Sequence, residues 1–271
     1  MRYSSLDNFT IQELMAVFLA RQLRDGDHLQ VGVALPVPEA AVRLAHIMHG
    51  PNMELIFLGA RMNVHQLEQL PLPEFGWDNR VVRWAESYSD RGHRFDQVKD
   101  WYRRVFFIGG VQVDRFGNTN LIGIGNDHQR LDFRGPGSVG TATLTTHVGR
   151  YYIVLNNHTP RLLVEKCDFI SAFGWGDGGA DARKRLGIPG GGPQLCITPL
   201  CVMDFAEGTK RMRLISVHPG VTIDDVKGAT GFPLEISDKL TTTKIPSLEE
   251  LTILRGRVDP NGSLRSEVEV F

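Results

Sequence analysis

The chain has 271 residues, with 30 Lys and Arg against 31 Asp and Glu and a formal net charge of −1. Hydrophobic residues make up 42% and charged residues 23%, which excludes extensive disorder and gives no general attraction to nucleic acid or to an anionic membrane. No apolar run approaches the roughly 20 residues that span a bilayer, and no secretory signal is visible. We therefore expect a cytoplasmic protein without nucleic-acid or membrane partners.

The first part of the chain predicts alternating helices and strands. Thr10 and Glu13 have the spacing of a capping box, and Gly26 suits the end of the helix that the box begins. The order helix, strand, helix, strand indicates a parallel sheet with crossover helices. The predicted elements are helices over 11–24, 39–49 and 95–104 and strands over 28–35, 54–58 and 105–108.

The second part predicts shorter strands and hairpins. Residues 109–125 alternate and turn at 116–118, as a hairpin does. Capping signals at Thr222 and Ser247 predict two late helices. No repeat or linker is visible, so we predict one α/β domain over 1–271, with an open, mostly parallel sheet flanked by helices and with added antiparallel hairpins. Further strands are predicted over 151–156, 167–172, 194–198, 202–205 and 212–216, the last two joined antiparallel by the turn 206–209.

Common catalytic signatures are missing from the sequence. It contains no P-loop, no dinucleotide fingerprint at a strand-to-helix junction, no G-x-S-x-G and no H-E-x-x-H. Cys167, Cys196 and Cys201 are predicted to be buried core residues, with a thiol nucleophile as the alternative. The scattered histidines indicate no metal site. The 29 glycines cluster in loops, where they permit tight turns or close approach to another object.

Five motifs carry a resemblance to a known family. The chain resembles the B subunit of glutaconate CoA-transferase and, more broadly, the β chains of class I CoA-transferases. The resemblance implies the CoA-transferase-like fold, an α-subunit partner in an α2β2 or larger heteromer, and an acyl-CoA site between the subunits. It implies no bound cofactor, since coenzyme A is part of the substrate. The motifs are FIGGVQVDRFGNTN (107–120), GPGSVG (135–140), the run 174–205, SVHPGV (216–221) and TGFPLEI (230–236).

The resemblance also implies a catalytic glutamate directly after a buried strand, and this sequence departs from it there. Aligning residues 54–62 with the family pattern places Leu58 at the nucleophile position, followed by Gly59 and Ala60. A hydrocarbon side chain cannot form the acyl anhydride of covalent CoA transfer. Glu54 could substitute only if the strand slid in register. We therefore assign no catalytic residue in this chain.

Family relatives that lack the glutamate indicate which reactions are possible without it. The chain resembles the ring-opening hydrolases of steroid catabolism, in which an acidic residue of the α subunit is thought to act as the base. A methylglutaconyl-CoA decarboxylase of the family has cysteine at this position, and this chain does not. The resemblance favours a hydrolase or lyase that cleaves a carbon–carbon bond of a cyclic β-keto acyl-CoA. A CoA-transferase, an acyl-CoA decarboxylase and a non-catalytic stabilising subunit remain as alternatives.

Such a reaction needs donors that stabilise an oxyanion or enolate. Main-chain N–H groups of the loops 109–112 and 135–138 are our candidates, although their glycines could equally serve tight packing alone. Arg61 is predicted to hold a substrate carboxylate or face solvent. Arg183, Lys184 and Arg185 are predicted to be exposed, with CoA phosphate contacts as the alternative. Trp84, Trp101 and Trp175 are expected in the core or a subunit interface. The predicted substrate-binding residues are Gly110, Gln112, Asn118, Gly135, Gly137, Ser138 and Arg61.

Overall fold

The computed structural model describes residues 9–32, 34–57, 60–63, 87–88, 98–138 and 140–266. The chain divides into two compact units. Unit 1 comprises residues 1–97 together with 244–271, and unit 2 comprises residues 98–243. The single domain expected over 1–271 stays a prediction.

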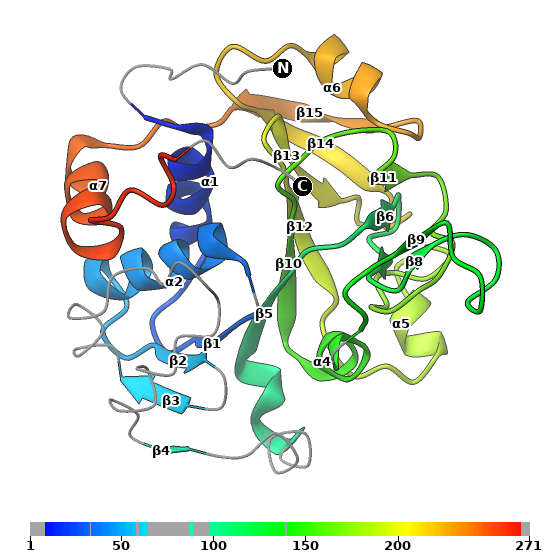
Figure 1. The fold of residues 1–271 in the computed structure, drawn as a ribbon, viewed down its shortest axis with the longest axis horizontal. Coiled ribbons are helices and arrows are strands. Elements are labelled where there is room, and N and C mark those ends of the chain that lie inside the picture. The colour runs from blue at the N-terminus through cyan, green and yellow to red at the C-terminus, as the bar shows by residue number, and fades with distance from the viewer. Residues whose placement is uncertain are drawn as a thin grey trace. The chain divides into compact units, whose positions relative to one another are not determined.

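Unit 1 contains the strand order β1-β2-β3-β4. The strand β1 pairs parallel to β2, and β2–β3 and β3–β4 pair antiparallel. The helix α1 packs on α2. The elements labelled in Figure 1 are α1 (Ile11–Ala20), β1 (His28–Val31), α2 (Pro36–Met48), β2 (Glu54–Phe57), β3 (Ala60–Asn63), β4 (Ser87–Tyr88) and α7 (Leu248–Ile253), and α7 continues into the π-helical turn η4 (Leu254–Val258).

The predicted start of α1 is confirmed and its predicted end is wrong. Thr10 Oγ1 accepts a hydrogen bond from Glu13 N at 3.2 Å, and Glu13 Oε2 accepts one from Thr10 N at 2.9 Å. The helix ends at Ala20, because the chain then continues through turns rather than to residue 24. The predicted strand 28–35 is also too long. Pro36 begins α2, since its fixed φ suits the first helical position.

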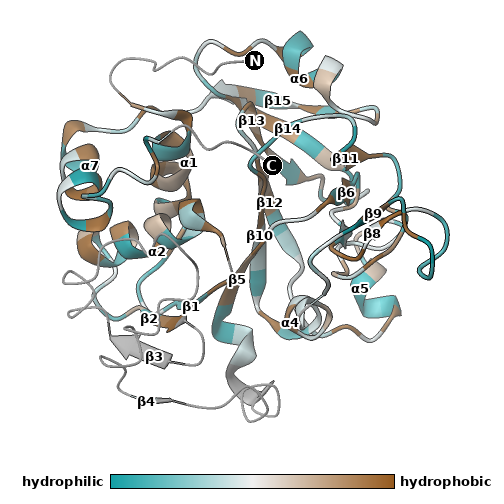
Figure 2. Cartoon of the chain, viewed as in Figure 1, coloured by the Kyte–Doolittle hydropathy of each residue, from teal (hydrophilic) through white to brown (hydrophobic). Residues whose placement is uncertain are grey.

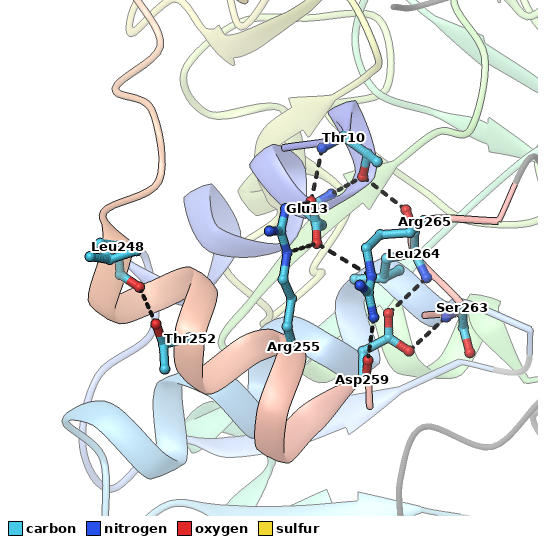
Figure 3. Close-up of polar contacts among 9 residues, drawn as sticks. All are labelled: Thr10, Glu13, Leu248, Thr252, Arg255, Asp259, Ser263, Leu264 and Arg265. Carbon is cyan, nitrogen blue, oxygen red and sulfur yellow. Dashed lines mark hydrogen bonds and ion pairs between the residues drawn. The ribbon is translucent and has the colours of Figure 1, made fainter. Parts of the chain in front are cut away.

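Glu13 joins the two chain ends that form unit 1 (Figure 3). Its side chain is 1% exposed and accepts hydrogen bonds from Arg255 Nε at 2.8 Å and Nη2 at 2.9 Å. Arg265 Nε lies 3.9 Å from the same carboxylate. Thr10 Oγ1 donates to the Leu264 carbonyl at 2.8 Å. The C-terminal segment therefore holds α1 through polar contacts that span more than 240 residues of sequence.

Unit 2 contains a sheet with the strand order β15-β14-β13-β12-β10-β5 and two small sheets, β11-β6-β7 and β8-β9. Its strands, all but β7 labelled in Figure 1, are β5 (Arg104–Ile108), β6 (Gln112–Asp114), β7 (Thr119–Asn120), β8 (Gly123–Ile124), β9 (Phe133–Arg134), β10 (Arg150–Val154), β11 (Leu163–Val164), β12 (Pro193–Ile197), β13 (Cys201–Phe205), β14 (Met212–Val217) and β15 (Glu235–Thr242). Its helices are η3 (Val98–Arg103), α4 (Thr141–His147), α5 (Ala182–Arg185) and α6 (Ile223–Ala229).

The sheet of unit 2 is mostly parallel. The strands β5, β10 and β12 run parallel, β13 is antiparallel to both of its neighbours, and β14 pairs parallel to β15. All of β5 is buried, and Figure 2 shows it as largely hydrophobic. The predicted hairpins β6–β7 and β13–β14 are both confirmed. The predicted fold class, a mixed α/β fold with a mostly parallel sheet flanked by helices, is confirmed.

Some predicted elements of unit 2 are wrong. The region 167–172 is no strand, because only Ala172 pairs there, in an isolated bridge with Thr119. The helix predicted over 95–104 appears as the short 3-10 helix η3. The prediction missed β15, whose residues are largely polar and half-exposed or exposed. Within the described residues, no helix is long and apolar enough to cross a membrane.

Candidate functional site

The candidate site lies at the carboxyl end of β5 in unit 2. Residues 109–110 follow the carboxyl end of β5, which runs parallel to β10, and lead into the β6–β7 hairpin. The carboxyl edge of a parallel sheet is the usual place for ligand sites in α/β proteins. Segments 121–141 and 171–176 are anchored on the same hairpin by hydrogen bonds, so three glycine-rich stretches meet there.

Gln112 presents a hydrogen-bond donor at this place. Its side-chain oxygen accepts from Asn120 Nδ2 at 2.7 Å and from Asp168 N at 3.0 Å. The orientation of Asn120 is itself set, because its Oδ1 accepts from Ile122 N at 2.9 Å. These contacts fix the Gln112 amide with its NH₂ group turned away from them. Among the described residues this NH₂ group has no acceptor, so it can donate to a substrate oxygen.

Asn118 is engaged within the chain. Its side chain is 1% exposed, and Nδ2 donates to Asp114 Oδ2 at 2.8 Å and to the Gly176 carbonyl at 2.7 Å. Its Oδ1 accepts from Gly174 N at 2.9 Å and Gly176 N at 3.2 Å. These bonds use the whole capacity of the amide. Asn118 therefore positions residues 174–176, and the predicted substrate contact would require breaking one of these bonds.

Asp114 sets the turn of the same hairpin. Its Oδ1 accepts from Phe116 N at 2.9 Å and Asn118 N at 3.1 Å. Burial raises the pKa of this carboxyl, and the hydrogen bonds from Asn118 and Phe116 act against that rise. The residue is 4% exposed, so it supports the loop rather than meeting solvent.

The loop 135–138 offers a different donor from the one predicted. The Gly135 and Gly137 N–H groups donate to the Ile122 and Leu121 carbonyls, each at 2.8 Å. They are therefore already occupied. The main-chain N–H of Ser138 has no acceptor in the part of the chain that the structure describes, and the same holds for that of Gly110. Gly110 N, Ser138 N and the Gln112 amide are thus three donors that the described residues leave open to a ligand.

The glycines of this loop also have a packing role. A Cβ on Gly135 would lie 2.4 Å from the Leu121 carbonyl oxygen, and Gly137 has a φ of +89°. Both positions exclude other residues unless the backbone moves. A Cβ on Gly110 would lie 2.5 Å from Thr119 Cγ2. At Gly110, close packing and an open N–H donor occur together. At Gly135 only the packing explanation applies, because its N–H already donates to the Ile122 carbonyl.

The predicted nucleophile position lies outside the described residues. Leu58 and Gly59 follow Phe57, the last residue of β2. Arg61 lies in β3, in register with Ile56. Trp84 also lies outside the described residues.

Glu54, the alternative nucleophile, lies at the amino end of β2. It is in register with His28 of β1, and Glu54 Oε2 lies 3.7 Å from His28 Nε2. The three residues of β2 that follow it, 55–57, extend the strand by about 10 Å beyond Glu54. The β1–β2 pairing fixes this register, so the structure gives no support to a slide that would bring Glu54 to the nucleophile position.

Arg183 differs from its prediction. It is 3% exposed rather than exposed, and burial lowers its pKa. Its guanidinium donates only to main-chain carbonyls, which come from three separate segments. The partners are Gly190 at 2.8 Å, Phe173 and Gly174 at 3.0 Å, Thr145 at 2.6 Å and Thr146 at 3.5 Å.

Lys184 and Arg185 are exposed, as predicted. Arg185 forms ion pairs with Asp177 and Asp181, which compensate its charge. With Arg183 buried and Arg185 paired, the three residues do not form a basic patch. The alternative that they bind CoA phosphates has no support in this arrangement.

The cysteines and two tryptophans lie in the core, as predicted. All three cysteines are free and buried. Burial raises the pKa of Cys201 to about 12 and raises those of Cys167 and Cys196. Trp101 and Trp175 are 1% and 9% exposed. Among the described residues, no group of three or more His, Cys, Asp or Glu could hold a metal ion.

The residues that anchor segment 121–141 were missed by sequence reasoning. Ser171 Oγ accepts from Leu121 N at 2.8 Å and donates to the Thr119 carbonyl at 3.0 Å. Thr141 Oγ1 donates to the Ser138 carbonyl at 2.6 Å. Small hydroxyl residues carry little signal by themselves, and their partners are up to 52 residues away in the sequence.

Comparison with known proteins identifies the family. The model of the coenzyme A transferase family matches residues 98–229. The chain is 34% identical to the B subunit of 3-oxoadipate CoA-transferase from Pseudomonas knackmussii, over 91% of this chain and 92% of the relative. It is 30% identical to the cholesterol ring-cleaving hydrolase IpdB subunit of Mycobacterium tuberculosis, over 94% of this chain and 97% of the relative.

The fold agrees with a solved member of the same family. The crystal structure of glutaconate CoA-transferase from Acidaminococcus fermentans matches with a TM-score of 0.84 and 29% identity, covering 95% of this chain and 98% of that chain. The relatives are B subunits of two-subunit enzymes, which implies an α-subunit partner. This chain is therefore a B-type subunit that belongs to the coenzyme A transferase family.

Proposed function

We propose that this subunit, with its α partner, hydrolyses a carbon–carbon bond of a cyclic β-keto acyl-CoA. The observation that carries the proposal is Leu58, which follows β2 at the position of the family's nucleophile and has no ionisable group. A reaction that needs no enzyme-bound acyl group is compatible with that residue, and covalent CoA transfer is not. The identity with the cholesterol ring-cleaving hydrolase subunit supports the same choice.

The chemistry proceeds without a covalent intermediate. A base of the α subunit takes a proton from water, and the hydroxide adds to the ketone carbon of the substrate. The bond between that carbon and the α carbon then breaks. Its electron pair forms the enolate of the thioester, which takes up a proton at the α carbon. The products are a carboxylate and an acyl-CoA, which for a cyclic substrate remain one ring-opened molecule.

This chain stabilises the oxygen on which negative charge develops. Three donors open to a ligand lie near the carboxyl edge of β5: Gly110 N, Ser138 N and the Gln112 side-chain amide. Fixed donors aimed at a developing oxyanion lower the barrier most, since they need no reorganisation during the reaction. Arg61 is proposed to hold a substrate carboxylate. No cofactor is required, because coenzyme A enters as part of the substrate.

A CoA-transferase is the second candidate. The 34% identity with the B subunit of 3-oxoadipate CoA-transferase favours it. It would need a carboxylate nucleophile, and the described residues near β2 offer Glu54 at the opposite end of the strand. An acyl-CoA decarboxylase and a non-catalytic stabilising subunit remain further alternatives. The cytoplasmic location and an α2β2 or larger assembly belong to the proposal.

Turnover in H₂¹⁸O tests the reaction type. The purified complex with its α subunit is given a cyclic β-keto acyl-CoA, and mass spectrometry follows the products. Hydrolysis places one ¹⁸O in the new carboxylate and leaves the thioester intact. Hydroxylamine and borohydride should then trap no acyl group or thioester on this chain. Glu54→Gln and Leu58→Ala should keep turnover.

CoA exchange between an acyl-CoA and a labelled carboxylate, lost in Glu54→Gln, would overturn the proposal in favour of transfer. Gln112→Glu tests the shared site, because it keeps the oxygen that accepts from Asn120 and removes the free donor. Turnover should fall at least tenfold while the complex stays intact. Unchanged turnover in that variant would favour the stabilising-subunit alternative.

A further inference from the structure

A buried polar cluster lies at the carboxyl ends of β10, β12, β14 and β15, and it shares no residue with the donors of the candidate site. Its two histidines have both ring nitrogens within hydrogen-bond distance of a partner. All of its members are at most 9% exposed, and most of them belong to sequence motifs that the proposed reaction does not use. The members are His158, Thr198, Cys201, Ser216, His218, Thr230 and Thr243.

The hydroxyl groups fix the proton of His158. Thr230 Oγ1 lies 2.7 Å from the Val226 carbonyl, which can only accept, so the single hydroxyl proton is donated there. Thr230 must then accept from His158 Nε2, at 3.0 Å. His158 Nδ1 is therefore unprotonated in the neutral ring and accepts from Thr198 Oγ1 at 2.8 Å.

The same reasoning fixes the proton of His218. Its Nε2 lies 2.9 Å from the Thr198 carbonyl, so this nitrogen carries the proton. Its Nδ1 then accepts from Thr243 Oγ1 at 2.9 Å, and Thr243 accepts in turn from Ser216 Oγ at 2.8 Å. Both rings are satisfied as neutral imidazoles with the proton on Nε2.

A second proton on His158 would conflict with these partners. Thr198 Oγ1 already accepts from Leu200 N and Cys201 N, both at 3.2 Å. A protonated Nδ1 would be a third donor to an oxygen with two lone pairs. The hydroxyl proton of Thr198 would have to turn to the Cys201 carbonyl, at 3.4 Å. The neutral network thus has better hydrogen bonds than the protonated one.

The electrostatics of the cluster agree with this geometry. Burial lowers the pKa of both histidines to about 4. Repulsion by His218 in its protonated form also lowers the pKa of His158. Among the described residues, the other titratable group that faces them is the Cys201 thiol, with Sγ 3.8 Å from His158 Nδ1. Burial raises the pKa of that thiol to about 12, so it stays neutral and compensates no positive charge.

We propose that His158 and His218 form an acid-sensitive lock that fastens residues 219–243 to the rest of unit 2. The bond from His158 to Thr230 holds the end of α6, and the bond from His218 to Thr243 holds the end of β15. The helix α6 contributes only Val226 to the buried residues, and its exposed residues are Asp224, Asp225, Lys227 and Gly228. Uptake of protons therefore favours release of this segment, which the packing of Val226 and the pairing of β15 with β14 oppose.

The direction of the pH dependence follows from the lowered pKa. A released histidine titrates near 6.5, so the released state binds more protons than the locked state between that value and about 4. The lock is therefore complete above about pH 6.5 and weakens as the pH falls toward 4. Each histidine contributes up to one proton, so the opening equilibrium changes by about tenfold per pH unit for one and up to about a hundredfold for both.

Hydrogen–deuterium exchange on the complex with the α subunit tests the proposal. Exchange rates are measured from pH 7.5 to 4.5 and corrected for the intrinsic pH dependence of amide exchange. Peptides within 219–243 should lose protection below about pH 6, while those of β5 and β10 keep theirs. His158→Gln should reduce the pH slope for residues 219–243 by about one proton. His128→Gln, which changes an exposed histidine, should leave the slope unchanged.

Protection of residues 219–243 that does not change with pH would overturn the proposal. An unchanged slope in His158→Gln would do the same. If that variant fails to assemble, the wild-type exchange pattern decides alone. Uniform loss of protection over all of unit 2 would contradict a local lock.

Discussion

Replacing Arg183 by Met removes a buried cation that binds three segments of unit 2 together. Its guanidinium donates to five main-chain carbonyls from residues 145–146, 173–174 and 190. Met fills a similar volume with no donor, so the carbonyls would face an apolar side chain. Thr145 and Thr146 lie in the last turn of α4, where a positive group also stabilises the helix end.

The magnitude follows from the number of carbonyls left without a donor. A buried acceptor that loses its partner costs about 1–3 kcal/mol, although some of the five can relax toward water. We expect Arg183→Met to lower the free energy of unfolding by about 4 kcal/mol, in the range that marks a broken buried network. Arg183→Lys should cost less, because an ammonium group supplies three donors.

Urea unfolding of the complex at fixed protein concentration measures the effect. Lys184→Met is the matched control, since it makes the same kind of change one residue away on an exposed side chain. Its cost should stay within about 0.5 kcal/mol. A cost for Arg183→Met within about 1 kcal/mol of the control would refute the reasoning that the five bonds stabilise unit 2.

Two further predictions concern the chain ends and the thiols. Arg255→Met should destabilise the complex by about 3 kcal/mol because it removes the guanidinium that donates to the buried Glu13 carboxylate and leaves Arg265 3.9 Å away, and adding Glu13→Gln should restore part of the loss in a double-mutant cycle. Additive effects of the two changes would contradict the pairing. A maleimide should label none of the three cysteines in the folded complex and all three in urea, because each is buried with a raised pKa. Labelling of the folded complex would show that one thiol is accessible.

Local features were predictable from the sequence. The capping boxes at Thr10, Thr222 and Ser247 act within three residues, and all three are present. The β6–β7 and β13–β14 hairpins follow from alternation on either side of a short turn, and both form. The predicted end of α1 is wrong because the apolar spacing continues past Ala20, while the hydrogen bonds of the chain change to turns.

The order of the motifs is visible in the sequence alone and predicted the family, which the comparisons confirm, whereas Leu58 at the nucleophile position stays a prediction. The role of each motif residue is not visible in the sequence. Asn118 and Gln112 both lie within eight residues of their hydrogen-bond partners in the hairpin. The Asn118 amide is saturated because it also contacts Gly176, whereas the contact of Asp168 N with the Gln112 oxygen leaves the Gln112 NH₂ group open. Arg183 looks like a surface cation beside Lys184, and it is buried because carbonyls from three distant segments converge on it. Sequence patterns report short-range geometry and periodic burial, whereas hydrogen-bond satisfaction inside the fold depends on which distant segments meet.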